Sequence, residues 1–152
     1  MAGIYGTVVS GATALTGGAA QTVLQVIAPT NQRVRILQTE IQFDGTNSAN
    51  TPALVQFNRQ TGGTFTTSVT AKKTSESSAT GETLQTAGKT AQTVAPTDGD
   101  ILFDRYVPVF GGLVVIPETP GQEMMIQGGT ILGIKVNAPQ GVNCKITVKF
   151  EE

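Results

Sequence analysis

Histidine and tryptophan are both absent from this chain of 152 residues. Histidine is the commonest general base and the commonest transition-metal ligand in proteins, so its absence excludes Ser–His and Cys–His nucleophilic arrangements. No glycine-rich phosphate-binding motif follows a predicted strand. We therefore expect a protein that is not an enzyme and that holds no cofactor.

Cysteine is nearly absent as well, because Cys144 is the only one. A single cysteine cannot form a disulfide within the chain, and it gives no indication of an oxidising compartment. Cys144 alternates in phase with Ile146, Val148 and Phe150. We therefore predict a small buried apolar side chain here rather than a reactive thiol.

Charged and aromatic side chains are scarce, at 14% and 5% of the residues, and the net charge is −1. A nucleic-acid-binding protein is expected to carry a basic stripe with interleaved aromatic residues. The only adjacent basic pair here is Lys72-Lys73, with no aromatic residue beside it. The first basic residue is Arg33, and no long apolar run is present, so neither a signal peptide nor a membrane span is expected. We expect no nucleic acid and no membrane among the partners.

Short segments of alternating apolar and polar residues dominate what is present. Strands are predicted over residues 21–27, 33–44, 53–59, 64–72, 101–109, 113–116, 123–127, 131–136 and 144–150. Glycine and proline turns separate them, and no apolar stripe of helical period persists for three turns. The pattern predicts an all-β fold, a jelly-roll-like antiparallel β-sandwich of about 8–10 strands without a long helix. The missing tryptophan and the single cysteine argue against an immunoglobulin domain.

The second predicted strand contains a break in its alternation. Leu37, Ile41 and Phe43 share one face, whereas Val34 and Ile36 are out of phase with them. We therefore expect a bulge or a bend near Ile36-Leu37.

Two segments do not fit a compact core, which suggests a division of the chain. Residues 1–20 are predicted to form an N-terminal extension or arm, and residues 21–152 a single β-sandwich domain. Within that domain, residues 73–98 are predicted to form a long polar loop. Three interpretations of this loop stay open: a solvated excursion, a limb that orders against a neighbouring subunit, and an edge strand around Thr83 to Thr93.

One cluster of carboxylates is a weak candidate for a metal site. Asp98, Asp100 and Asp104 could offer oxygen ligands to calcium. The spacing is not that of an EF-hand loop, because no glutamate closes it and a predicted strand begins where further ligands would be needed. We favour a polar turn at the entry to the strand.

Several stretches together resemble a known group of proteins. They are LVQFNRQTGGT (Leu54 to Thr64), GGLVVIPETPGQEMMIQGG (Gly111 to Gly129), LGIKVNAPQGVN (Leu132 to Asn143) and the final Glu-Glu. The pattern resembles capsid decoration (cement) proteins of tailed bacteriophages, of the single jelly-roll type, and is strongest over residues 111–152. The chain departs from the pattern at Phe150, where a tryptophan often precedes the final pair of glutamates.

The resemblance implies a structural virion protein that binds the outside of a phage head and stabilises the capsid shell. It also implies the major capsid protein as partner, a homotrimer as the oligomeric state, and the virion as location after synthesis in the host cytoplasm. The extension and the loop are the expected contact segments, so we predict the following capsid or subunit contacts: Ile4, Tyr5, Val8, Val9, Lys72, Lys73 and Leu84.

Two alternative functions stay open. A phage tail, fibre or baseplate component could use the same fold, although no internal repeat of the kind typical of fibres is present. A ligand-binding β-sandwich module is the other alternative, and the shortage of aromatic residues counts against a carbohydrate site.

Overall fold

The computed structural model describes residues 4–45, 51–74, 83–117 and 119–152. These ranges contain twelve strands and no helix. The strands are β1 (Tyr5–Leu15), β2 (Ala20–Ile27), β3 (Val34–Phe43), β4 (Ala53–Thr61), β5 (Thr64–Thr70), β6 (Lys72–Lys73), β7 (Ala87–Val94), β8 (Thr97–Val107), β9 (Gly112–Val115), β10 (Met124–Ile126), β11 (Ile131–Asn137) and β12 (Val142–Glu151). Because β6, β9 and β10 have four residues or fewer, nine longer strands form most of the fold.

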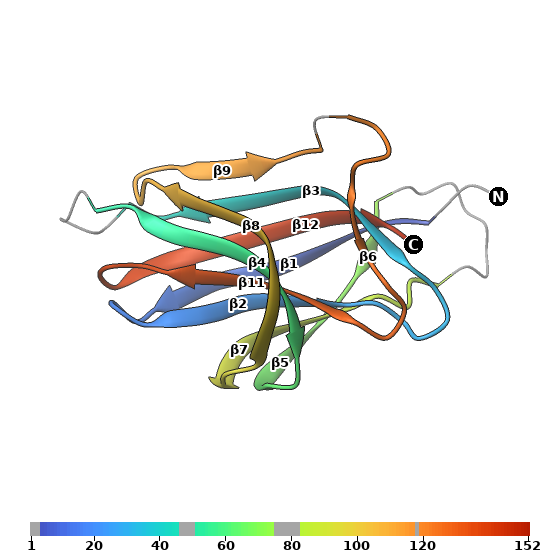
Figure 1. The fold of residues 1–152 in the computed structure, drawn as a ribbon. Coiled ribbons are helices and arrows are strands. Elements are labelled where there is room, and N and C mark those ends of the chain that lie inside the picture. The colour runs from blue at the N-terminus through green and yellow to red at the C-terminus, as the bar shows by residue number, and fades with distance from the viewer. Residues whose placement is uncertain (1–3, 46–50, 75–82, 118) are drawn as a thin grey trace.

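The strands form two antiparallel sheets that pack face to face as a sandwich (Figure 1). Sheet A has the order β10-β3-β12-β1-β6, and β9 also pairs with β3. Sheet B has the order β5-β7-β2-β11-β4-β8. The chain alternates between the sheets from β1 to β4 and again from β11 to β12, so the turns join the two layers. The predicted class, an all-β antiparallel sandwich, is confirmed.

Strand β1 packs across the sandwich on β7. A Cβ atom added at Gly88 of β7 would lie 2.5 Å from Cγ1 of Val8, so the two strands are in close contact there. The β6 end of sheet A therefore lies over the β5 end of sheet B. At the other side of the molecule, β9 and β10 lie along the outer edge of sheet A and β8 is the outer strand of sheet B; β8 and β9 come close where the chain passes from one to the other (Figure 1).

The core lies between the sheets and follows the alternation along each strand. In β12, the side chains of Val142, Cys144, Ile146, Val148 and Phe150 are buried, and the residues between them are half-buried or exposed. Burial raises the pKa of the Cys144 thiol to about 12. The prediction of a buried, structural cysteine is therefore confirmed.

The bulge expected near Ile36-Leu37 is also confirmed. Lys149 of β12 faces Gln38 of β3, and the next residue, Phe150, faces Ile36. Leu37 is therefore the extra residue on β3. This insertion shifts the alternation by one position, so both halves of β3 turn apolar side chains toward the core.

The prediction of an N-terminal arm outside the sandwich is wrong for residues 5–15. These residues form β1, which pairs with β12 inside sheet A, and Val8 is a core residue. A bulge at Ser10-Gly11 interrupts the alternation and conceals the strand in the sequence. Gly11 takes a positive φ of 71°, and the Ser10 hydroxyl oxygen accepts a hydrogen bond of 2.9 Å from the backbone N–H of Ile146.

The prediction of a polar loop over residues 73–98 is wrong for its second part. Residues 87–94 form β7, and β8 begins at Thr97. The alternative of a strand around Thr83 to Thr93 is closer, but β7 lies between β5 and β2 and is not an edge. β7 lacks apolar alternation because small residues such as Gly88 face the core there. Residues 75–82 of the predicted loop lie outside the described residues.

Glu152 follows β12 and is hydrogen-bonded both to the residue before β1 and to the segment before β7. Its backbone exchanges two hydrogen bonds of 2.9 Å with Ile4. Its carboxylate accepts hydrogen bonds from the backbone N–H of Gln85 at 2.7 Å and of Thr86 at 2.8 Å, and also contacts the Thr86 hydroxyl. Thr86 is 3% exposed, so this carboxylate satisfies polar groups that water cannot reach freely.

Candidate functional site at an apolar edge

Most of the exposed apolar side chains belong to the outer strands on one side of the sandwich, β8 of sheet B and β9 and β10 of sheet A. Among the described residues, seven of the ten exposed large hydrophobic side chains lie on β8, on β9, on the segments that flank β9, or on β10. They are Ile101, Leu102, Tyr106, Phe110, Val114, Ile116 and Met125. We call these seven residues the β8–β9 edge. Soluble proteins expose large apolar patches mainly where another surface covers them, so this edge is the candidate interaction site.

The backbone of β8 is also available at this edge. β8 is the last strand of sheet B, and within the described ranges only β4 pairs with it. It is eleven residues long and contains no proline. Two register shifts interrupt its pairing with β4, so the regular row of N–H and C=O groups to which another strand can be added is the part from Phe103 to Val107.

The side chains of β8 separate into an inner and an outer set. The Phe103 ring lies 4.8 Å from the Phe57 ring, measured between centroids, and the Arg105 guanidinium lies 5.3 Å from the centroid of Phe103. Asp104 and Tyr106 alternate with this pair and therefore face away from the core. Both are exposed, and Tyr106 is 69% exposed. The outer face of β8 thus offers an aromatic side chain beside a carboxylate.

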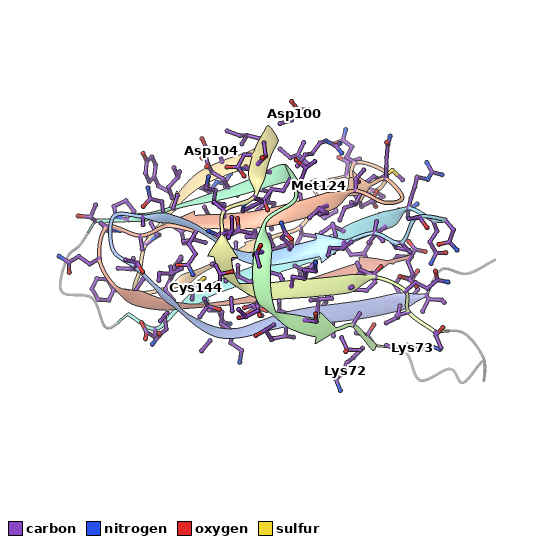
Figure 2. The ribbon with its side chains drawn as sticks, turned by 90° about the horizontal axis from the view of Figure 1, so that it is seen from below. Lys72, Lys73, Asp100, Asp104, Met124 and Cys144 are labelled. Atoms are coloured by element: carbon purple, nitrogen blue, oxygen red, sulfur yellow. The ribbon has the colours of Figure 1, made fainter. Side chains whose placement is uncertain are left out.

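The three aspartates considered as a weak calcium site do not form one. Asp98 contacts the Lys135 ammonium and accepts a hydrogen bond of 2.7 Å from Gln60 Nε2. Burial alone would raise the pKa of Asp98, but the hydrogen bonds from Lys135 and Gln60 lower it below its ordinary value of 3.8. Asp100 and Asp104 are exposed on the same side of the molecule (Figure 2). In the described part of the chain, no three acidic or cysteine side chains are placed to hold a metal ion.

Gln60 links this ion pair to a buried polar network that sequence reasoning missed. Its Oε1 accepts a hydrogen bond of 3.1 Å from Gln25, and its Nε2 donates one of 2.9 Å to the Thr22 hydroxyl. Gly133 of β11 provides the space, because a Cβ atom there would lie 1.8 Å from Gln60 Oε1. The network fixes the start of β8 to β4 and β2. A lone glycine within an apolar strand is the one sequence signal that could have indicated such a close approach.

The predicted contact residues divide into buried and exposed groups. Val8 is 0% exposed, so its assignment as a contact residue is wrong: it faces the core, and the next residue, Val9, faces outward. Tyr5 and Val9 are 41% and 37% exposed on β1. Lys72 and Lys73 are exposed on β6, on the side of the molecule opposite the aspartates (Figure 2).

Ile4 and Leu84, the other two predicted contact residues, are half-buried. Leu84 packs against the core, and its Cδ1 would lie 2.7 Å from a Cβ atom added at Gly6. Gly6 in turn pairs with Lys73. The structure therefore brings Leu84 close to the exposed lysines, and Ile4 next to Glu152.

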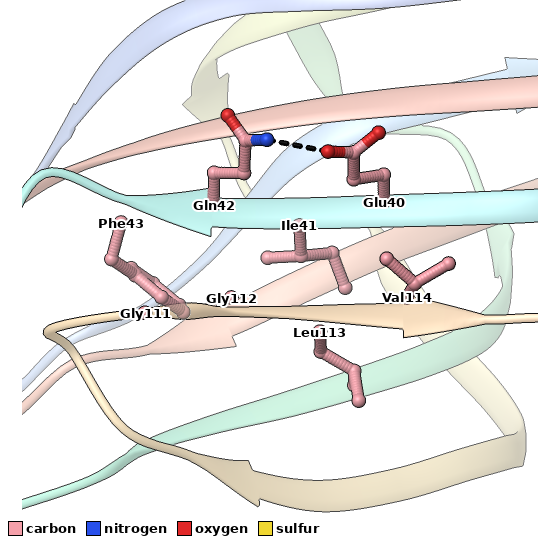
Figure 3. A pocket seen from close by; sticks show the side chains of 8 residues that line it. All are labelled: Glu40, Ile41, Gln42, Phe43, Gly111, Gly112, Leu113 and Val114. Atoms are coloured by element: carbon pink, nitrogen blue, oxygen red, sulfur yellow. Dashed lines mark hydrogen bonds between the residues drawn. The ribbon is translucent and has the colours of Figure 1, made fainter.

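A shallow open pocket of about 340 Å³ lies over the paired strands β3 and β9 (Figure 3). It is lined by residues 40–43 and 111–114. Gly112 allows β9 to approach β3, because a Cβ atom there would lie 2.5 Å from the carbonyl oxygen of Ile41. Glu40 is the one titratable side chain in the lining, and it accepts a hydrogen bond from Gln42. The pocket thus offers apolar contact area and one carboxylate, but no pair of groups for acid–base chemistry.

The fold and this edge define the chain as a β-sandwich with an exposed apolar side. No protein-family model matches its sequence, and neither a curated protein nor a solved structure matches it. Among the described residues, no helix has the length and apolar character to span a membrane.

Proposed function

We propose that this chain is a non-enzymatic structural protein of a phage virion. It binds the outside of the head, contacts the major capsid protein, and stabilises the shell as a homotrimeric decoration protein. The observation that carries the proposal is the β8–β9 edge, which holds seven of the ten large apolar side chains that are exposed among the described residues. An assembly in which a partner covers this edge is stabilised, because the exposed apolar side chains are then removed from water.

The segments that resemble decoration proteins also build part of this edge. Residues 111–129 contain β9 and β10 and supply Val114, Ile116 and Met125. Residues 132–143 contain most of β11 and the turn into β12. The resemblance and the exposed apolar surface therefore meet in the same part of the chain.

Cosedimentation with phage heads tests the proposal. Purified protein is mixed with expanded heads, unexpanded heads and isolated tails of a tailed phage that encodes it. We expect saturable binding to expanded heads and a rise in the temperature at which those heads disrupt. Recovery in the pellet that does not depend on expanded heads would contradict the proposal, and binding to tails alone would support the alternative of a tail component.

A variant pair shows whether head binding depends on the β8–β9 edge, either directly or through the assembly that covers it. Ile116→Ser removes an apolar side chain that is 60% exposed at the edge, and it should weaken cosedimentation with expanded heads. Lys145→Ser shortens an exposed side chain on the central strand β12 and should leave cosedimentation unchanged.

A further inference from the structure

We infer that the partner of the β8–β9 edge is the opposite edge of a second copy of this chain, so that copies associate head to tail. The inference rests on the proposed function, in which this edge is covered in an assembly, and it names the surface that covers it. Three observations carry it: the composition of the opposite edge, the distribution of charge, and the size of the apolar strip.

The opposite edge consists of β5, β6 and the outer side of β1, and we call it the β5–β6 edge. In the part of the chain that the structure describes, β6 pairs only with Gly6 and Thr7 of β1. Among the described residues, the rest of the outer side of β1 therefore has no strand partner. Tyr5 and Val9 expose apolar surface on β1. Each edge of the sandwich thus offers an unpaired strand backbone together with apolar side chains.

The exposed charges of the two edges have opposite sign. Asp100 and Asp104 lie on β8, and Lys72 and Lys73 form β6. Within the described residues, neither lysine is in an ion pair. Figure 2 shows the aspartates on one side of the molecule and the lysines on the other, so a single chain cannot bring them together. Two copies in head-to-tail contact can.

Two exposed cations lie near the aspartates: Arg105 on β8 and Arg59 on the neighbouring strand β4, whose carbonyl oxygen would lie 3.2 Å from a Cβ atom added at Gly99. Asp98 is already paired with Lys135. Arg105 lies over the Phe103 ring on the inner side of β8, whereas Asp104 faces outward. The outer face of β8 therefore presents negative charge to a partner. Complementary charge of this kind favours association and fixes the orientation of the two surfaces.

The exposed apolar surface of the β8–β9 edge is large enough for such a contact. Tyr106 and Phe110 are 69% and 58% exposed. An aromatic side chain offers about 150–250 Å², so with the five aliphatic side chains the strip exposes on the order of 500 Å² of apolar surface. A stable interface of standard size buries about 800 Å² on each partner, part of it polar. A partner that covers these side chains together would therefore bury an apolar area large enough for the centre of a stable interface.

A head-to-tail contact is favoured over a contact between two β8 strands. Self-pairing of β8 would bring the aspartates of both copies to one interface, where like charges repel. A contact between two different edges avoids this repulsion and leaves one edge of each kind free. Copies joined in this way form a ring when the rotation between them closes.

Charge reversal tests the interface in the absence of heads. The association of the parent protein is measured by light scattering and sedimentation over the micromolar range, where we expect an oligomer. Asp100→Lys with Asp104→Lys should weaken association by about tenfold or more, because both edges then carry positive charge. Lys72→Glu with Lys73→Glu should do the same with negative charge. All four substitutions in one chain should restore association to within a few-fold of the parent.

The control is Lys145→Glu with Lys149→Glu on the central strand β12, which changes the net charge by the same amount and in the same direction as Lys72→Glu with Lys73→Glu. It should leave association unchanged. A monomeric parent, a double variant at either edge that associates as the parent does, or a fourfold variant that stays dissociated would each overturn the interface. So would a control that weakens association equally. An oligomeric parent that fails to bind expanded heads would instead remove the proposed function and leave the interface standing.

Discussion

Gly133→Ala tests the buried polar network that fixes the start of β8. A Cβ atom at this position would lie 1.8 Å from Oε1 and 2.1 Å from Cδ of Gln60. The Gln60 side chain must therefore leave its place, because no small adjustment removes so close a contact. Its hydrogen bonds with Gln25 at 3.1 Å, Thr22 at 2.9 Å and Asp98 at 2.7 Å would break together.

The expected loss in the free energy of unfolding follows from the burial of Gln25 and Thr22, the hydrogen-bond partners that Gln60 would leave behind. Gln25 and Thr22 are each 1% exposed, so their polar groups would lose a partner where water is scarce. Leaving a buried polar group unsatisfied costs about 1–3 kcal/mol. Gln25 keeps a weaker contact with the Gly62 carbonyl, and Asp98 keeps Lys135. We therefore expect the free energy of unfolding to fall by about 2–4 kcal/mol, which for a chain of this size lowers the melting temperature by roughly 5–15 °C.

Denaturant unfolding measures this loss as a shift in midpoint at constant slope. Gly111→Ala is the matched control, because no atom of the described residues lies within 4 Å of a Cβ atom added there. That exchange should change the free energy of unfolding by less than about 1 kcal/mol, in the stabilising direction. Adding Gln60→Ala to Gly133→Ala should cost little more, because the side chain has already lost its contacts. A Gly133→Ala protein with the midpoint of the parent would refute the reasoning.

Four further perturbations test other parts of the structure. Deleting residues 1–15 removes β1 from sheet A and should abolish the cooperative unfolding transition; a sigmoidal transition in the shortened chain would contradict the role of β1. Glu152→Ala removes a carboxylate that accepts hydrogen bonds from buried groups and should lower the free energy of unfolding by about 1–2 kcal/mol, whereas an unchanged midpoint would argue against this anchor. Because the pKa of Asp98 is lowered on folding, its contribution is present at neutral pH and is lost as the pH falls below about 4; Asp98→Asn should flatten the acid limb of the stability profile, and superimposable profiles would exclude the contribution. With a thiol pKa of about 12, Cys144 should resist thiol reagents at pH 8 until the chain unfolds, and rapid labelling of the folded protein would show that it is accessible.

The sequence predicts the parts of this fold in which large apolar residues alternate along a strand. β12 is the clearest example, and its buried face was predicted from the phase shared by Cys144, Ile146, Val148 and Phe150. The bulge at Leu37 was predicted in the same way, since a single change of phase between two apolar runs indicates one extra residue.

Strand β1 was missed, and β7 was predicted only as one of three alternatives, because the side chains of both strands are mostly small. Gly88 of β7 meets Val8 of β1 at a distance that leaves no room for a larger residue, so neither strand shows a run of large apolar side chains. The partner of β1 is β12, at the other end of the sequence, and no local pattern indicates that pairing. Whether these two segments form strands therefore depends on their tertiary contacts and not on a local pattern in the sequence.

The candidate site could be predicted only in part, for a related reason. Alternation shows which residues of β8 share a face, but not that the strand has a single neighbour. Ile101 and Tyr106 therefore resemble ordinary strand residues in the sequence, and their exposure follows from the position of β8 at the end of sheet B. Gln25 and Gln60 resemble solvent-facing residues, although both are buried.

The backbone pairing of Ile4 with Glu152 also makes a rearrangement of the chain order feasible. A short linker could join the two ends, and the circularised chain could be reopened at the exposed Gly62-Gly63 turn between β4 and β5. Such a circular permutant would keep every strand pairing of both sheets. The β1–β12 pairing, which spans nearly the whole sequence in the parent, would become a local hairpin. Because folding rates rise as the mean sequence separation of contacts falls, contacts around this hairpin would form earlier in the permutant than in the parent.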